Sequence, residues 1–188
     1  MASGAFASTR REAGFSLVEV VFAMFILTAV AIGIAQLFAV STMANWRAKV
    51  QTSSSVLATQ KMEQLRALTW AFDGEGLPVS DVVTRLDTPL PTGGGQGLNP
   101  SPANALTQDT QGYVDYLDLH GAYIGTAPTT AAAYCRRWSI QPLPTNPNNT
   151  LVFQVRVIPI TEQANADATG QRALEEALIF SVKTRKAP

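Results

Sequence analysis

A single carboxylate, Glu19, lies near the start of a long apolar segment, residues 15–40, that contains no other charged residue. Burying a lone ionised carboxylate in lipid or in a protein core costs several kcal/mol. Glu19 therefore needs a partner of opposite charge. The chemistry that this residue predicts is charge pairing within an apolar environment.

The residues just before the apolar segment predict a cleavage site. The leader, residues 1–14, is mostly small and polar and carries two adjacent arginines, which favour retention of this end in the cytoplasm. An ordinary secretory signal peptide has its small-residue cleavage site after an apolar region of about 7–15 residues. Here the small residues Ala13 and Gly14 precede the apolar segment. A protease at the cytoplasmic face could therefore remove the leader, leave the membrane helix intact and release Phe15 as a new amino terminus.

The stretch GFSLVE, residues 14–19, resembles the recognition stretch of type IV prepilins and type II secretion pseudopilins. In that family a membrane peptidase cleaves after the glycine and methylates the new terminal residue, usually phenylalanine. The glutamate four residues further on serves filament assembly. The resemblance thus implies cleavage after Gly14, N-methylation of Phe15 and an assembly role for Glu19.

The same resemblance implies partners and a location. The partners are prepilin peptidase, other major and minor pilin or pseudopilin subunits, and inner-membrane lipid before assembly. The chain would cross the bacterial inner membrane once, with its N-terminus cytoplasmic and its head periplasmic, and would then enter a pilus or a pseudopilus.

Within this family the stem favours a minor subunit. The stretch LATQKMEQLRAL, residues 57–68, is similar to the stem end of minor pilins and pseudopilins, and Gln36 stands where major pilins often have a proline. The leading hypothesis is a minor type IV pilin, at the tip of the pilus or as a priming subunit. The alternatives are a type II secretion pseudopilin, a membrane-anchored periplasmic binding module that does not polymerise and, third, a membrane-tethered enzyme.

Composition limits the other functions. The 188 residues are enough for one domain and an appendage, and the 14 basic and 14 acidic residues cancel, so no nucleic-acid partner is predicted. The lone cysteine, Cys135, excludes an intrachain disulfide. With His120 it could form a nucleophile and a base, but a lone cysteine is more often a small buried hydrophobe. We therefore expect no enzyme and no cofactor.

Three aspartates in the middle of the chain, Asp109, Asp115 and Asp118, could gather around a calcium ion, and the resemblance allows this because some pseudopilins bind one. Their spacing does not match an EF-hand loop. A solvated loop is the favoured interpretation, and no metal site is predicted.

A long helix must position Glu19 and the cleavage site. About 20 residues span a bilayer as a helix, so residues 15–40 are long enough. Residues 41–69 contain neither proline nor glycine and continue the helix to about Thr69. Apolar residues recur there at spacings near three and four, on one face: Val50, Leu57, Ala58, Met62, Leu65 and Leu68. We expect the chain's own sheet to cover this face, rather than a partner in a coiled coil.

The C-terminal half predicts an antiparallel sheet. Strands are expected at residues 134–141, 151–160 and 178–184, with less regular ones within 79–87 and 112–125. In the first strand Tyr134, Arg136, Trp138 and Ile140 share a face; in the second Phe153, Val155 and Val157 do so. Pro159 should mark a strand end or edge.

The predicted fold class is α+β and pilin-like, with a long N-terminal helical stem packed against a C-terminal antiparallel β-sheet. The segments are a leader peptide (1–14), a membrane and assembly half of the stem (15–43), an amphipathic half (44–72) and a β-rich head with Gly/Pro-rich loops (73–188).

Overall fold

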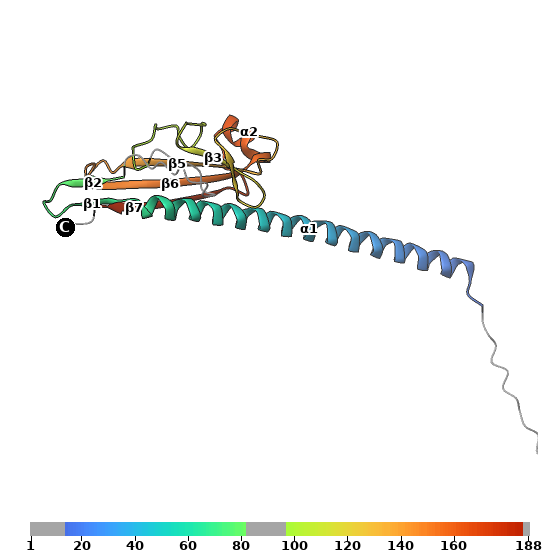
Figure 1. The fold of residues 1–188 in the computed structure, drawn as a ribbon. Coiled ribbons are helices and arrows are strands. Elements are labelled where there is room, and N and C mark those ends of the chain that lie inside the picture. The colour runs from blue at the N-terminus through green and yellow to red at the C-terminus, as the bar shows by residue number, and fades with distance from the viewer. Residues whose placement is uncertain (1–13, 82–96, 186–188) are drawn as a thin grey trace, which may run out of the picture. The chain divides into compact units, whose positions relative to one another are not determined.

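The computed structural model describes residues 14–81 and 97–185. The chain divides into two compact units, Met1–Asn45 and Trp46–Pro188. Its layout is α+β, with a long N-terminal helix followed by an antiparallel sheet, as predicted (Figure 1). The leader, apart from Gly14, lies outside the described residues.

Helix α1, Leu17–Ala67, begins in the first unit and ends in the second. Its first turn starts at Ser16, whose carbonyl accepts a hydrogen bond from the amide of Val20 at 3.2 Å. At the other end, Nζ of Lys183 donates to the carbonyl oxygens of Arg66 (2.6 Å) and Leu68. A helix end leaves such carbonyls without intrahelical partners, so this lysine caps α1.

The first unit consists, in its described part, of the start of α1. Every described residue up to Asn45 is exposed, and most are apolar. An 18-residue window of α1 has a mean hydropathy of 2.6 and at most two charged residues, so the helix is long and apolar enough to cross a membrane. This agrees with the predicted membrane half of the stem.

The second unit contains a five-stranded antiparallel sheet in the order β4-β3-β5-β6-β7. Its strands are β3 (Val114–Leu117), β4 (Tyr123–Gly125), β5 (Tyr134–Pro142), β6 (Thr150–Pro159) and β7 (Ala177–Thr184). The three longer strands confirm the predicted strands, and β3 and β4 lie within residues 112–125, where a less regular strand was expected. A second, two-stranded sheet joins β1 (Trp70–Phe72) to β2 (Pro78–Ser80).

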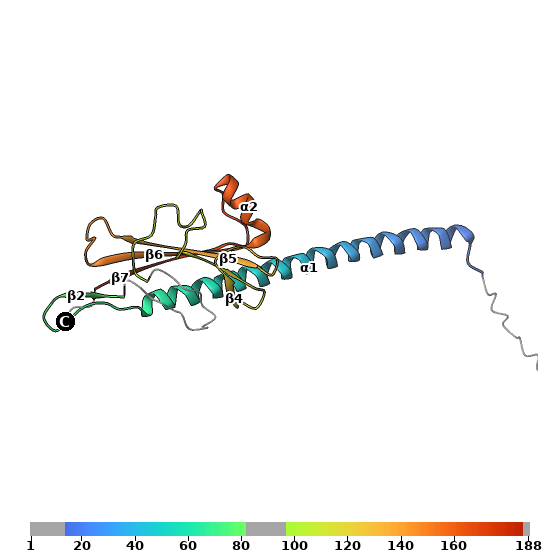
Figure 2. The same ribbon diagram turned by 45° about the horizontal axis from the view of Figure 1, so that its top comes forward.

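The second half of α1 packs on one face of the five-stranded sheet, while α2, Ile160–Thr169, lies on the other (Figures 1 and 2). The predicted apolar face of α1 is confirmed, because five of its six residues are buried in the main core and Leu68 packs against it. From the sheet, this core receives Tyr134, Trp138 and Ile140 of β5 and Phe153, Val155 and Val157 of β6. The chain's own sheet therefore covers the amphipathic stripe.

The sequence prediction missed two features. Strand β6 ends at Pro159 as expected, but α2, which was not predicted, follows at once. Helix α2 ends at Gly170, whose left-handed backbone (φ 67°) and amide bond to the carbonyl of Ala166 form a glycine C-cap. Strand β1 was not predicted. Of the strand expected within residues 79–87, only its start falls in β2, and residues 82–87 lie outside the described residues.

Candidate processing and assembly site

The predicted cleavage site lies in an open stretch directly before α1. Residues 14–16 have no helical structure, and the side chain of Phe15 is 82% exposed. Among the described residues, no atom lies within 4 Å of a Cβ atom added to Gly14. Residues 14–81 and 97–185 thus place nothing against Gly14 that would oppose entry of the Gly14–Phe15 bond into a peptidase.

Glu19 lies in the first turn of α1, one turn after Phe15. Phe15 and Glu19 line the same open hollow, of about 390 Å³, together with four apolar residues of the next two turns: Val20, Ala23, Met24 and Leu27. The carboxylate and the predicted new terminus therefore border the same hollow. A negative charge in the first turn also interacts favourably with the helix dipole, by about 0.3–1 kcal/mol at an exposed site.

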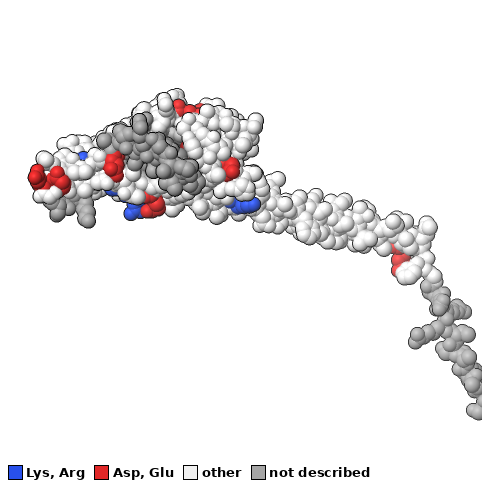
Figure 3. Space-filling view, in the orientation of Figure 1, with Lys and Arg blue, Asp and Glu red and all other residues white. Residues whose placement is uncertain are grey.

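The described part of the first unit, residues 14–45, offers Glu19 no basic partner. Between residues 14 and 45 the chain contains no lysine, arginine or histidine. On the side drawn in Figure 3, this part of α1 carries acidic atoms near its start and is otherwise uncharged. A cation for Glu19 must come from outside this stretch or from the amine that cleavage would create at Phe15.

The possible nucleophile and base are not brought together. Cys135 is completely buried on the face of the sheet away from α1, in a cluster with Val114 and Tyr116. Burial raises its pKa to about 12, so the thiol stays protonated at neutral pH. His120 lies in the loop between β3 and β4, where it lines a hollow with Leu57 of α1, on the opposite side of the sheet.

The three aspartates do not gather at one site, because each lies in a different place with partners of its own. Asp109 accepts two hydrogen bonds from Arg137, on the outer face of the sheet. Asp115 is buried on the α1 face. Asp118 accepts hydrogen bonds from the backbone amides of the next turn, which lower its pKa. Over residues 14–81 and 97–185, no three Asp, Glu, His or Cys residues are placed to hold a metal ion.

A buried charged cluster joins α1 to the sheet, and sequence reasoning missed it. Nε and NH2 of Arg136 in β5 each donate to a carboxylate oxygen of Asp115 in β3 at 2.8 Å, and NH1 donates to the carbonyl of Leu57 in α1 at 3.2 Å. Nζ of Lys61 lies 3.6 Å from the same carboxylate. The only available signal was the placement of Lys61 and Arg136 on otherwise apolar faces.

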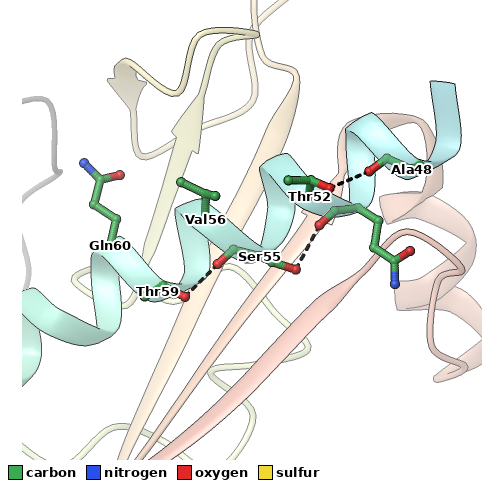
Figure 4. A pocket seen from close by; sticks show the side chains of 7 residues that line it. Ala48, Thr52, Ser55, Val56, Thr59 and Gln60 are labelled. Carbon is green, nitrogen blue, oxygen red and sulfur yellow. Dashed lines mark hydrogen bonds between the residues drawn. The ribbon is translucent and has the colours of Figure 1, made fainter. Parts of the chain in front are cut away.

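The opposite side of α1 in the second unit is a hydroxyl-rich surface. A hollow of about 680 Å³ is lined by small and medium side chains, which Figure 4 shows: Ala48, Gln51, Thr52, Ser55, Val56, Thr59 and Gln60. The hydroxyls of Thr52, Ser55 and Thr59 each donate to the carbonyl four residues before, at 2.8–2.9 Å. Because these donors are satisfied within the helix, the surface presents little unmet polarity.

Comparison with known proteins identifies the N-terminal segment. Residues 9–35 match the prokaryotic N-terminal methylation motif, which marks type IV pilin-like proteins. Gly14, Phe15 and Glu19 lie inside the matched residues, and the long apolar start of α1 fits this class. The chain matches no curated protein and no solved structure.

Proposed function

We propose that this chain is a minor type IV pilin, a structural subunit that prepilin peptidase processes and that enters a pilus through α1. The observation that carries the proposal is the methylation motif over residues 9–35, followed directly by an apolar helix long enough to cross a membrane. The motif implies processing by prepilin peptidase and assembly with other pilin-type subunits. Gln36, which stands where major pilins often have a proline, favours a minor rather than a major subunit.

In this proposal the chain has four segments with different roles. The leader, residues 1–14, is removed by cleavage after Gly14, and Phe15 becomes the N-methylated terminus. Residues 15–43 hold the subunit in the inner membrane before assembly and contact neighbouring stems afterwards. Residues 44–72 join this part to the periplasmic head, residues 73–188.

Glu19 selects the position at which the subunit docks. Cleavage at Gly14 creates a cationic amine at Phe15, and methylation keeps the charge. An internal pair is possible because both residues line the same hollow, but the amine of an adjacent subunit is the partner that couples this charge to assembly. An unpaired carboxylate costs several kcal/mol in apolar surroundings, whereas the uncharged residues after it slide along a neighbour with little preference.

The substitution Glu19→Ala tests this role. We expect normal cleavage and membrane insertion, but a loss of incorporation into sheared filaments on the order of tenfold or more, since each 1.4 kcal/mol of lost pairing is a factor of ten. Glu19→Asp, whose side chain is one methylene shorter, should recover only part of the wild-type incorporation. Immunoblots of sheared filaments measure incorporation, and immunoblots of membranes measure cleavage and insertion.

Gln36→Ala is the matched control, because Gln36 is a polar but uncharged residue of the same apolar helix. It should be incorporated like the wild-type chain. Wild-type incorporation of Glu19→Ala would show that Glu19 does not select the register, and would favour a membrane-anchored module that does not polymerise. If the chain were found in a secretion pseudopilus instead of a pilus, it would be a pseudopilin and not a minor pilin.

A further inference from the structure

The second unit begins at an exposed tryptophan, Trp46, which is 56% exposed. The other two tryptophans lie within the head: Trp138 is completely buried, and the half-buried indole of Trp70 donates a hydrogen bond to the carbonyl of Asn149 at 3.0 Å. The first buried residue of α1 is Val50. Trp46 therefore follows the exposed start of the helix and comes just before its covered part.

The exposed helix before Trp46 matches the thickness of a bilayer. From Leu17 to Asn45, α1 is about 43 Å long at 1.5 Å per residue, and a bilayer with its headgroup regions is about 40–45 Å thick. If Glu19, the only charged residue of this stretch, lies in the inner headgroup region, the outer headgroup region falls close to Trp46. Because helix side chains lean toward the N-terminus of their helix, the indole reaches back toward the membrane.

The charges beside Trp46 suit the phosphates of phospholipids. Residues 20–62 contain no aspartate or glutamate, and Arg47 and Lys49 follow the apolar stretch at once. Nε of Arg47 lies 3.5 Å from a carboxylate oxygen of Glu175, so this cation faces the head. Lys49 is exposed, and residues three apart are neighbours on a helix, so its ammonium group and the indole of Trp46 lie on adjacent parts of the surface.

We propose that Trp46 and Lys49 anchor the unassembled subunit to phospholipid headgroups at the periplasmic surface of the inner membrane. The indole N–H donates to lipid oxygens while its ring lies at the border of the acyl chains, the position that amphipathic rings favour. The ammonium group of Lys49 pairs with a lipid phosphate. The anchor sets the depth of α1 before assembly and rests on the proposed function, in which the membrane holds the stem until it enters the filament.

Depth-dependent fluorescence quenching tests this anchor. The full chain would be reconstituted into vesicles of phosphatidylethanolamine and phosphatidylglycerol that carry a nitroxide either at the headgroup or near the end of an acyl chain. We expect the headgroup nitroxide to quench Trp46 severalfold more than the deep nitroxide does. Trp46→Phe should lose this quenching, whereas Trp70→Phe, the matched control, should keep it.

The role of Lys49 is tested by reversing its charge. Lys49→Glu should weaken quenching by the headgroup nitroxide and move the emission of Trp46 to longer wavelength, because lipid phosphates repel the new carboxylate. Lys49→Arg keeps the charge and should behave like the wild-type chain. Wild-type quenching of Lys49→Glu would overturn the role of Lys49.

Flotation of the same vesicles separates failure of the anchor from failure of the proposed function. If the chain floats with the vesicles but neither nitroxide quenches Trp46, the anchor is wrong, a neighbouring subunit becomes the better partner for this surface, and the membrane stage of the proposed function stands. Stronger quenching by the deep nitroxide would also overturn the anchor. A chain that does not float with the vesicles would overturn both.

Discussion

Gly14→Val is expected to leave the precursor uncleaved in the membrane, with a loss of processing on the order of a hundredfold. A peptidase must approach the backbone beside the bond that it cleaves, and glycine alone offers no side chain there. A Cβ at Gly14 meets no atom of the described residues within 4 Å, so the substitution introduces no clash in that part of the fold. Any block must therefore arise in the complex with the peptidase. The fraction of processed chain can be measured on a gel, where the precursor and the mature chain differ in mobility.

Gly33→Val is the matched control for this experiment. Gly33 lies in the same apolar helix, and a Cβ added there also meets no atom within 4 Å. We expect this variant to be processed at the wild-type rate. If Gly14→Val were processed equally well, the leader boundary would not be at Gly14.

The largest effect on stability is expected for Asp115→Asn. This change leaves Lys61 and Arg136 buried without the carboxylate that they share, and breaking a buried ion pair from one side costs about 3–5 kcal/mol. The free energy of unfolding, measured by urea titration of the full chain in detergent, should fall by this amount. Asp118→Asn is the matched control; it should change little, because Asp118 is an exposed turn residue and asparagine can accept the same backbone bonds.

A combined replacement separates the cost of an uncompensated charge from the loss of packing. Lys61→Met, Asp115→Leu and Arg136→Met together remove every charge of the cluster while keeping apolar volume. Replacing a whole buried ion cluster in this way is often neutral or stabilising. The triple variant should therefore be more stable than Asp115→Asn. If both are equally destabilised, side-chain volume rather than charge governs this interface.

The elements with a clear hydrophobic period could be predicted from the sequence. The spacing of three and four from Val50 to Leu65 gave the buried face of α1, and the alternation of Phe153, Val155 and Val157 gave the inner face of β6. Both patterns arise because one side of a regular element must face the core. The recognition stretch from Gly14 to Glu19 was equally readable, because its residues are adjacent in sequence.

Other features depend on partners that are distant in the sequence. Helix α2 buries only Ala166, so its sequence carries almost no apolar period. It contacts the sheet through the ion pair of Asp167 with Arg137 and the hydrogen bond that Gln163 donates to the hydroxyl of Tyr116. The cluster of Lys61, Asp115 and Arg136 comes from three separate elements. No local pattern could show that these side chains meet, or that Asp115 serves an arginine rather than a metal ion.

The mass of the mature N-terminal peptide tests the central claim most directly. Membranes and sheared filaments from cells with an active prepilin peptidase would be digested, and the N-terminal peptide would be sequenced by mass spectrometry. We predict a peptide that begins at Phe15 and is one methyl group heavier than its unmodified sequence. A membrane-bound chain that still begins at Met1 in such cells would contradict this account.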